Sequence, residues 1–243
     1  MARGPGLILS IDRFDYGGQP LFQDFSLSVA PGATVALIGP SGAGKTTLLR
    51  ILAGVETAFH GQVLVEGRPA PLAPVPGFVF QDARLLPWKT VAQNLSVVRH
   101  DLTPDEIETA LSDVGLAGLS DAWPRQLSGG MQRRVGLARA LAVNAHLLLL
   151  DEPFVSLDRA VVHELQALLA RLIAARATTV VMVSHDPEDA ARLADRAVLI
   201  AGRPVRIMAD LVDLGPAPQA RSRADVAAIV ERIESAMSGE VPA

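Results

Sequence analysis

The stretch TVALIGPSGAGKTTLLR, residues 34–50, decides the fold. An apolar run at Thr34–Ile38 leads directly into GPSGAGKTT at Gly39–Thr47, and a helical pattern follows from Thr46 to Ala53. The second segment matches G-x-x-x-x-G-K-[S/T] in full, in the strand-to-helix context that this phosphate-binding loop requires. The alternative is a glycine-rich turn with a solvated lysine, which the flanking strand and helix disfavour.

The chemistry of this loop suits a triphosphate and a divalent cation. Glycines leave room for backbone N–H groups to curl around phosphate oxygens, and Lys45 adds a positive charge. The Thr46 hydroxyl is a suitable ligand for Mg²⁺, a hard cation that prefers oxygen. We therefore expect the loop to bind ATP with Mg²⁺. The expected nucleotide contacts are Gly39, Pro40, Ser41, Gly42, Ala43, Gly44, Lys45, Thr46 and Thr47.

A second segment, LLLLDEP at Leu147–Pro153, supplies the carboxylates that the loop lacks. Its apolar residues predict a buried strand, and Asp151 follows at the carboxyl end, where α/β sheets bind ligands. We expect Asp151 to hold Mg²⁺ through water and Glu152 to polarise the attacking water. With Lys45 neutralising charge, the reaction indicated is in-line transfer of the γ-phosphoryl group to water. The alternative is an acidic pair exposed after a strand, which the phosphate loop disfavours.

Further apolar runs alternate with helical patterns along the chain. They have the length of strands buried on both faces of a parallel sheet. A helical stripe also recurs at spacings of three and four between Val161 and Ile173. This alternation predicts an α/β fold with right-handed crossovers. The runs are Leu7–Ile11, Thr34–Ile38, Gly77–Phe80, Leu147–Leu150, Thr179–Val183 and Ala197–Ile200.

Three parts of the chain depart from this alternation. Segments around Leu7–Ile11, Leu27–Val29 and Val63–Val65 alternate more between polar and apolar residues, which indicates an antiparallel side sheet. Residues 82–144 contain helical patterns and turns but no convincing buried strand, so we expect a helical insertion into the core. Residues 216–243 predict a loop and a surface helix.

Composition limits the classes of function. The 243 residues carry a net charge of −4, which does not favour nucleic acid as a partner. There is no cysteine, which removes disulfide and thiolate chemistry. The first residues, MARGPGLILSIDRF, do not predict a secretory signal, and no apolar run approaches the roughly 20 residues that cross a bilayer. We expect a cytoplasmic protein that reaches a membrane only through a partner.

A second anion seat is predicted at QLSGGMQRR, Gln126–Arg134. The residues from Met131 to Ala142 read as an amphipathic helix, and Ser128 with two glycines opens it. The free N–H groups of such a helix start attract an anion. The alternative is a serine cap followed by glycines of no special function.

The order of these motifs resembles that of the nucleotide-binding subunits of ABC transporters. LSGG ahead of DEP is far more specific than the phosphate loop, which many unrelated ATPases share. The resemblance implies a P-loop NTPase core with a mostly parallel sheet, an antiparallel N-terminal β-subdomain and an inserted helical subdomain, within a nucleotide-binding domain of residues 1–215. The ordered set spans about residues 7–205 and comprises the phosphate loop, Gln81 after a strand, LSGGM at Leu127–Met131, LLLLDEP, SLD at Ser156–Asp158 and SHD at Ser184–Asp186.

The resemblance also explains why one chain would carry two anion seats. In the family two subunits face each other head to tail around two ATP molecules. Ser128, Gly129 and Gly130 of one copy would then complete the γ-phosphate site of the other. Losing the γ-phosphate weakens such a dimer, so hydrolysis can drive motion.

Other residues take expected roles from the resemblance, position by position. Gln81 resembles the glutamine that contacts Mg²⁺ and the attacking water, Asp158 the aspartate that crosses the dimer interface, and His185 the histidine that touches the γ-phosphate. Tyr16 is expected to stack on adenine. From the residues alone, His185 could instead cap the next helix and Tyr16 could be a turn residue. The sequence departs from the commonest family pattern at Met131, where most members have glutamine.

The segment QDARLLPWKTVAQNL, Gln81–Leu95, looks like the same region of importers of sulfonates, taurine and nitrate. An exposed apolar LLPW before a helix is typical of a patch that docks another protein. The family docks its membrane permease in this region, with Trp88 as an expected anchor. Ordinary packing within the helical insertion is the alternative for Trp88.

The expected function is therefore that of an ATP-hydrolysing subunit of an ABC importer, which acts on a small solute such as a sulfonate, taurine or nitrate. Its expected partners are a second copy of itself, transmembrane permease subunits and, indirectly, a solute-binding protein, on the cytoplasmic face of the cell membrane. An exporter subunit or a soluble ABC-type ATPase in DNA repair or translation is the alternative. The soluble class would predict a long coiled coil or a tandem second cassette, and neither is evident.

Overall fold

The computed structural model describes residues 3–143, 145–215 and 217–238. A six-stranded sheet forms its centre, in the order β10-β9-β3-β8-β7-β6. Strands β9, β3, β8, β7 and β6 run parallel, and β10 pairs antiparallel with β9 at one edge. The strands are β3 (Thr34–Ile38), β6 (Gly77–Val79), β7 (Leu147–Asp151), β8 (Thr179–Ser184), β9 (Arg196–Ala201) and β10 (Arg206–Leu211).

The inner strands are apolar throughout because both faces of this sheet are covered. Alternate residues of β3 enter different cores: Val35 and Leu37 pack on one side, Ala36 and Ile38 on the other. Strands β7 and β8 divide their residues in the same way. A period of two is therefore present in the packing, although the sequence shows only a continuous apolar run.

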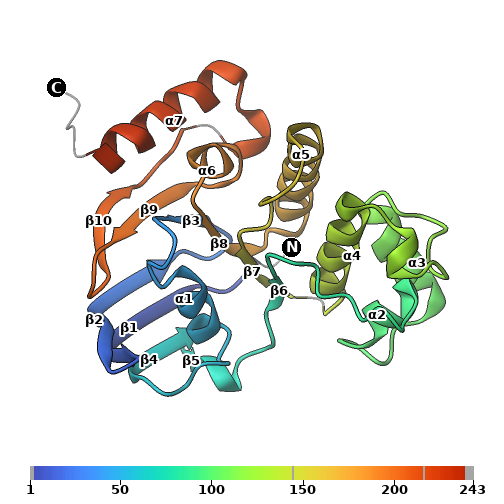
Figure 1. The fold of residues 1–243 in the computed structure, drawn as a ribbon, viewed down its shortest axis with the longest axis horizontal. Helices are drawn as coiled ribbons and strands as arrows, with labels where there is room; N and C mark the ends of the chain where they lie inside the picture. The colour runs from blue at the N-terminus through green and yellow to red at the C-terminus, as the bar shows by residue number, and fades with distance from the viewer. Residues whose placement is uncertain (1–2, 144, 216, 239–243) are drawn as a thin grey trace.

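A four-stranded sheet in the order β2-β1-β4-β5 lies to one side of the central sheet (Figure 1). Its strands are β1 (Leu7–Tyr16), β2 (Gln19–Val29), β4 (His60–Val65) and β5 (Arg68–Pro69), and every pairing in it is antiparallel. Helix α1 (Lys45–Leu52) packs its buried leucines between the two sheets. The antiparallel sheet expected from Leu7–Ile11, Leu27–Val29 and Val63–Val65 is confirmed.

One expectation for the first strand is wrong. The apolar run Leu7–Ile11 predicts a strand buried on both faces, but Ile8 is 53% exposed while Leu7, Leu9 and Ile11 are buried. The strand lies in the antiparallel sheet, which has one face on the core and one in solvent. Its outward residues include Ile8, an apolar side chain that hid the alternation.

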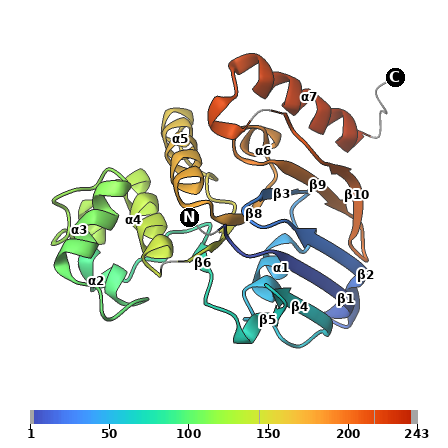
Figure 2. The ribbon, with the colours of Figure 1, turned by 180° about the vertical axis from the view of Figure 1, so that it is seen from behind.

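Between β6 and β7 the chain leaves the sheet as a helical lobe (Figures 1 and 2). Residues 82–143 contain no strand, and Asn144, the last residue of the expected insertion, lies outside the described residues. The lobe consists of α2 (Val91–Ser96), α3 (Pro104–Asp113), the short 3₁₀ turn η2 (Pro124–Gln126) and α4 (Gly129–Ala142). Thr90 and Thr103 form capping boxes at the starts of α2 and α3, which fixes where these helices begin.

The remaining helices cover the other face of the central sheet. Helix α5 (Arg159–Arg176) buries part of the predicted stripe through Leu165, Leu168 and Leu169. Helix α6 (Pro187–Leu193) packs against α5 and α7 (Arg223–Ser238), and α7 also contacts β10. Two short 3₁₀ turns, η1 (Ala70–Leu72) and η3 (Pro218–Ala220), complete the description. Over the described residues, no helix is both long enough and apolar enough to span a membrane.

Candidate functional site

Four neighbouring parallel strands end at one edge of the central sheet and deliver most of the predicted site residues there. The phosphate loop follows β3, His185 follows β8, Asp151 ends β7 with Glu152 directly after it, and Gln81 comes shortly after β6. Because β3, β8, β7 and β6 are adjacent in the sheet, residues up to 146 positions apart in sequence are brought together. This edge is where open α/β sheets bind ligands.

The phosphate loop is a tight turn that depends on glycine. Gly42 and Gly44 have positive φ values of 80° and 74°, which favour glycine, and Gly44 precedes the first residue of α1. The ammonium of Lys45 is 5% exposed and donates to Gly39 O at 2.8 Å and to Pro40 O at 3.0 Å. The first turn of α1 contains no acidic residue, so its positive helix end is available to an anion.

The three residues expected at the cation lie close to this loop. Thr46 Oγ1 donates to Asp151 Oδ1 at 2.9 Å, and Gln81 lines the same cavity as Thr46. Burial raises the pKa of Asp151, while the hydrogen bond from Thr46 opposes that rise. All three residues present oxygen atoms, the donor type that Mg²⁺ prefers, so the donor set fits this ion.

Glu152 is held in a strained conformation between two groups that can be cationic. Its φ of 44° is unusual for a non-glycine residue, and its N–H donates to Val183 O at 3.0 Å. One carboxylate oxygen lies 3.6 Å from Lys45 Nζ, and the other lies 3.2 Å from His185 Nδ1. The side chain is thereby directed at the phosphate loop.

Lys45, Thr46, Gln81 and Glu152 line a cavity of about 360 Å³ beside the phosphate loop, whereas His185 lines a neighbouring cavity. Tyr16, 65% exposed at the end of β1, lines the same cavity, and its stacking on adenine stays a prediction. Two lining residues were not predicted: Leu21 on β2 and Arg203 in the turn between β9 and β10. The backbone contact from Val205 N to Leu21 O, 2.8 Å, holds this turn against β2. No pattern in the sequence indicated that contact, because it joins segments that are remote along the chain.

The second predicted seat forms a separate structure on the helical lobe. Ser128 is exposed and caps α4, accepting a hydrogen bond from Met131 N at 3.3 Å. Neither this helix start nor Asp158, the exposed residue before α5, is among the described residues that line the cavity beside the phosphate loop. The structure of one chain therefore does not bring Ser128, Gly129, Gly130 and Asp158 to the phosphate loop.

Two arginines that the sequence analysis missed tie α4 to the catalytic segments. Arg139 donates to Ala83 O at 2.7 Å and to Arg84 O at 2.9 Å, just after Gln81. Arg133 donates to Val155 O at 3.2 Å, just after Glu152. Burial lowers the pKa of both guanidinium groups. Their arginine-rich context, QRRVGLARA, offered only the signal of basic residues on a mostly apolar helix.

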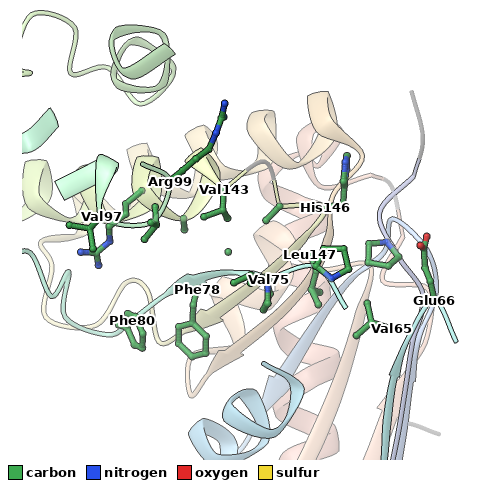
Figure 3. A pocket seen from close by; sticks show the side chains of 18 of the residues that line it. Val65, Glu66, Val75, Phe78, Phe80, Val97, Arg99, Val143, His146 and Leu147 are labelled. Atoms are coloured by element: carbon green, nitrogen blue, oxygen red, sulfur yellow. The ribbon is translucent and has the colours of Figure 1, made fainter. Parts of the chain in front are cut away.

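A larger cavity of about 980 Å³ lies away from the phosphate loop, between β6 and the helical lobe. Figure 3 shows Phe78 and Phe80 on one side of it, with Val97 and Val143 on the other. The C-terminal ends of α2 and α4 both lie at this cavity and contribute residues to its lining. Its lining is mainly apolar, with several arginines among the polar residues: Arg3, Arg68, Arg84, Arg99 and Arg139.

The LLPW segment, Leu85–Trp88, is half-buried at its two leucines and exposed at Pro87 and Trp88, and hydrogen bonds order its backbone. Trp88 is 68% exposed. Asn94, which is fully buried in α2, accepts from Leu86 N at 2.7 Å and donates to Leu86 O and Lys89 O at 3.2 and 3.1 Å. The loop around Trp88 is therefore fixed from inside, and ordinary internal packing does not account for the indole.

Comparison with known proteins agrees with this architecture. The sequence model of the family described as "ABC transporter" matches residues 22–155. An aliphatic sulfonates import ATP-binding protein SsuB of Granulibacter bethesdensis is 44% identical over 201 residues, which cover 82% of each chain. The protein of the same description from Pectobacterium atrosepticum is 39% identical over 248 residues, covering 100% of this chain and 92% of that one.

A solved structure shares the fold. It is the dimeric, post-hydrolysis state of the ATP-binding cassette MJ0796 bound to ADP and Pi. That chain is 26% identical, with a TM-score of 0.72 over 84% of this chain and 97% of its own length. The fold, the phosphate loop and the relatives agree: the chain belongs to the ABC transporter family, as an ABC-type ATPase that binds ATP.

Proposed function

We propose that this protein is the ATP-hydrolysing subunit of an importer for a small organic sulfonate, with taurine among the candidate solutes and nitrate as a related anion. The observation that carries the ATPase part is the convergence of Lys45, Thr46 and Glu152 on one cavity. The identity of 39–44% to aliphatic sulfonate import ATP-binding proteins supports the solute class.

Hydrolysis follows from the positions of the chain's own groups. Lys45 neutralises charge on the β- and γ-phosphates, and Mg²⁺ held near Thr46, Gln81 and Asp151 would supply further charge neutralisation. Glu152 polarises a water molecule for in-line attack on the γ-phosphorus. His185, 3.2 Å from the Glu152 carboxylate, orients that carboxylate, and the family resemblance gives it a contact with the γ-phosphate.

The second anion seat requires another copy of the chain. Ser128 and the α4 N-terminus carry no cation or carboxylate of their own, and the first turn of α4 is free of acidic residues. We propose that they bind the γ-phosphate held by a partner's phosphate loop, with Tyr16 stacked on adenine and Asp158 at the interface between copies. The dimeric structural relative supports this arrangement.

The cavity of about 980 Å³ between β6 and the helical lobe is the proposed contact with the permease. Its apolar walls at Phe78 and Val97 suit an apolar element of a partner, and exposed Trp88 provides an anchor nearby in the chain (Figure 3). Arg139 lines this cavity and also donates to the backbone after Gln81. A docked partner that displaces Arg139 would therefore shift the segment that carries Gln81 at the ATP site. We place the protein at the cytoplasmic face of the membrane, held there by the permease.

In this arrangement residues 1–215 act as the nucleotide-binding domain and residues 82–144 as its permease-facing lobe. The tail, residues 216–243, adds α7, which packs on α6 and also contacts β10.

Glu152→Gln tests the hydrolytic mechanism. The amide keeps the size of the side chain but cannot act as a base, so turnover should fall by a factor of about 10² to 10⁴ while ATP binding persists. The variant should accumulate as an ATP-dependent dimer in light scattering, and ADP should not support that dimer. Hydrolysis at the parent rate would refute the role of Glu152.

Transport by the assembled system tests the solute class. The chain would be reconstituted with its co-purifying permease and a solute-binding protein, and uptake of ¹⁴C-labelled ethanesulfonate, ¹⁴C-labelled taurine and ¹⁵N-labelled nitrate would be compared. ATP-dependent uptake of the sulfonate supports the proposed solute class.

Permease docking has its own test. The Trp88→Ala variant should weaken co-purification with the permease. Efflux, or co-purification with ribosomes or DNA instead of a permease, would favour the exporter or the soluble class.

A further inference from the structure

A buried polar cluster lies behind the turn that carries His185. Its centre is Asp189 in the first turn of α6, a carboxyl only 5% exposed. Asp189 Oδ2 accepts from Ser184 Oγ at 2.5 Å, and Asp189 Oδ1 accepts from Gln166 Nε2 at 2.8 Å. Burying a carboxyl group is costly unless its hydrogen bonds are satisfied, so this placement calls for an explanation.

The cluster holds the turn on both sides of His185. Ser184 Oγ, which donates to Asp189, also accepts from Asp186 N at 3.0 Å. His185 lies between these two residues, and its Nδ1 is 3.2 Å from Glu152 Oε2. A continuous chain of contacts thus runs from Asp189 through the turn to Glu152.

The same carboxyl group reaches α5. Gln166, 3% exposed, lies in the middle of this helix, which begins directly after Asp158. A cavity of about 270 Å³ separates the His185 turn from the segment before α5, and Gln166, His185 and Asp189 all line it. Asp189 is therefore the buried group that joins the two sides of this gap, while Glu188, which is more exposed, lies 3.7 Å from Arg159 and 3.6 Å from His163 of α5.

We propose that Asp189 is a positioning residue that sets His185 against Glu152 and fixes the His185 turn relative to α5 and the Asp158 segment. The proposal rests on the role proposed above for His185 and Glu152 in ATP hydrolysis. Asp189 itself does not touch the nucleotide cavity, so it acts through Ser184 and Gln166.

The electrostatics of the cluster give an independent signature. Burial raises the pKa of Asp189 to about 6. The folded state therefore binds a proton more tightly than the unfolded state, and stability should fall as pH rises from about 4 to about 6, then level off. Asp189→Asn should remove this slope in urea titrations, and an unchanged slope would overturn the placement of the carboxyl. The ionisable groups around the cluster are Arg159, His163, His185, Asp186 and Glu188.

Two substitutions of Asp189 by residues of similar size test whether its hydrogen bonds position the His185 turn or whether its side chain only fills space. Asp189→Leu removes both acceptors, and we expect kcat to fall by about 10- to 100-fold with ATP affinity changed less than about 2-fold. Asp189→Asn should retain kcat within about 3-fold, because Gln166 Oε1 is buried without a described partner and can accept from the new amide after the glutamine turns. Equal loss in both variants, or parent kcat in Asp189→Leu, would overturn the proposal.

A double-mutant cycle identifies the residue through which Asp189 acts. In a His185→Ala background, Asp189→Leu should lower kcat little further, whereas multiplicative losses would show an unrelated structural defect. Ser184→Ala removes the hydrogen bond from Ser184 to Asp189 with a smaller change in size, and it replaces Asp189→Leu in the cycle if that variant does not fold. Asp195→Asn is the matched control, since Asp195 accepts from Thr34 N at 2.8 Å, away from the turn, and should leave kcat unchanged.

The outcomes also separate this proposal from the proposed function. If His185→Ala and Glu152→Gln retain the parent rate, the catalytic roles fail whatever Asp189 does. If both lose activity while Asp189→Leu and Ser184→Ala keep it, only the positioning role of Asp189 fails.

Discussion

The starts of α1 and α4 look alike in sequence but are built differently. Each is a helix N-terminus with glycines, and neither has an acidic residue in its first turn. Helices α3 and α6 do carry acidic residues there. At α1, however, buried Lys45 and two nearby carboxylates surround the helix start, whereas at α4 Ser128 is exposed and serves only its own cap.

This difference shows what each helix start can do alone. The α1 region has a cation, cation ligands and a candidate base within one cavity, so it is chemically equipped in a single chain. The α4 region offers only N–H groups and a hydroxyl, so it can bind charge but cannot activate water. The comparison predicts that damage at α1 abolishes nucleotide binding, while damage at α4 affects turnover alone.

Lys45→Ala should have the largest effect. Lys45 is buried against Gly39 O and Pro40 O, and no other cation in the described residues lines this cavity except Arg203. We expect turnover to fall by at least about 100-fold, with ATP binding by calorimetry lost or strongly weakened. Unchanged binding and turnover would contradict the claim that the start of α1 binds the nucleotide within a single chain.

Ser128→Arg should abolish turnover without weakening ATP binding to the isolated monomer. The arginine places bulk and charge on an exposed helix start that the cavity beside the phosphate loop does not include. Ser128→Asn keeps a helix cap and is the matched control for loss of the cap, which costs about 1 kcal/mol. Equal loss of monomer binding in Ser128→Arg would contradict a role between copies.

The adjacent glycines of α4 should respond differently to alanine. A Cβ on Gly130 would lie 2.9 Å from Val161 Cγ1 on α5, so the helix start must shift. A Cβ on Gly129 would meet nothing within 4 Å in the single chain. We expect Gly130→Ala to lower the melting temperature and to reduce turnover by several-fold. Gly129→Ala should leave the melting temperature unchanged or raise it. A loss of turnover confined to Gly129→Ala would show that its open side faces a partner.

Arg203→Ala should have the smallest effect. Its exposed side chain lines the same cavity as Tyr16, and no hydrogen bond or ion pair of its guanidinium is found within the described residues. We expect a 2- to 5-fold weaker affinity for ATP, in line with an exposed cation–π or phosphate contact. Arg206→Ala, on the same hairpin but outside the cavity, should leave affinity unchanged, and equal effects of the two variants would exclude a specific contact.

The sequence predicted the central sheet and the phosphate loop well because both depend on local signals. A buried strand followed by GPSGAGKTT leaves little freedom, and the fold expected around it is confirmed. The edge strand β10 was missed because its outward residues, among them Met208, are exposed and give no buried pattern. Roles for Gln81 and Asp158 came only from family resemblance and stay predictions.

What the sequence could not predict are contacts between segments that are distant along the chain. The Asp189 cluster joins α5, β8 and α6 through side chains that look unremarkable in PEDAARL and HELQALL. The hydrogen bonds of Arg139 to the backbone after Gln81 are another case. Such contacts depend on the three-dimensional packing of elements, which no periodicity records.

The buried amide of Asn94 has a consequence for how transport systems diverge. Because it binds the backbone of Leu86 and Lys89 from within, the shape of the loop does not depend on which side chains point outward. Pro87 and Trp88 can therefore be exchanged by mutation with little penalty to folding. A substitution at either position would change the surface that this loop presents to a partner, while the loop backbone keeps its shape.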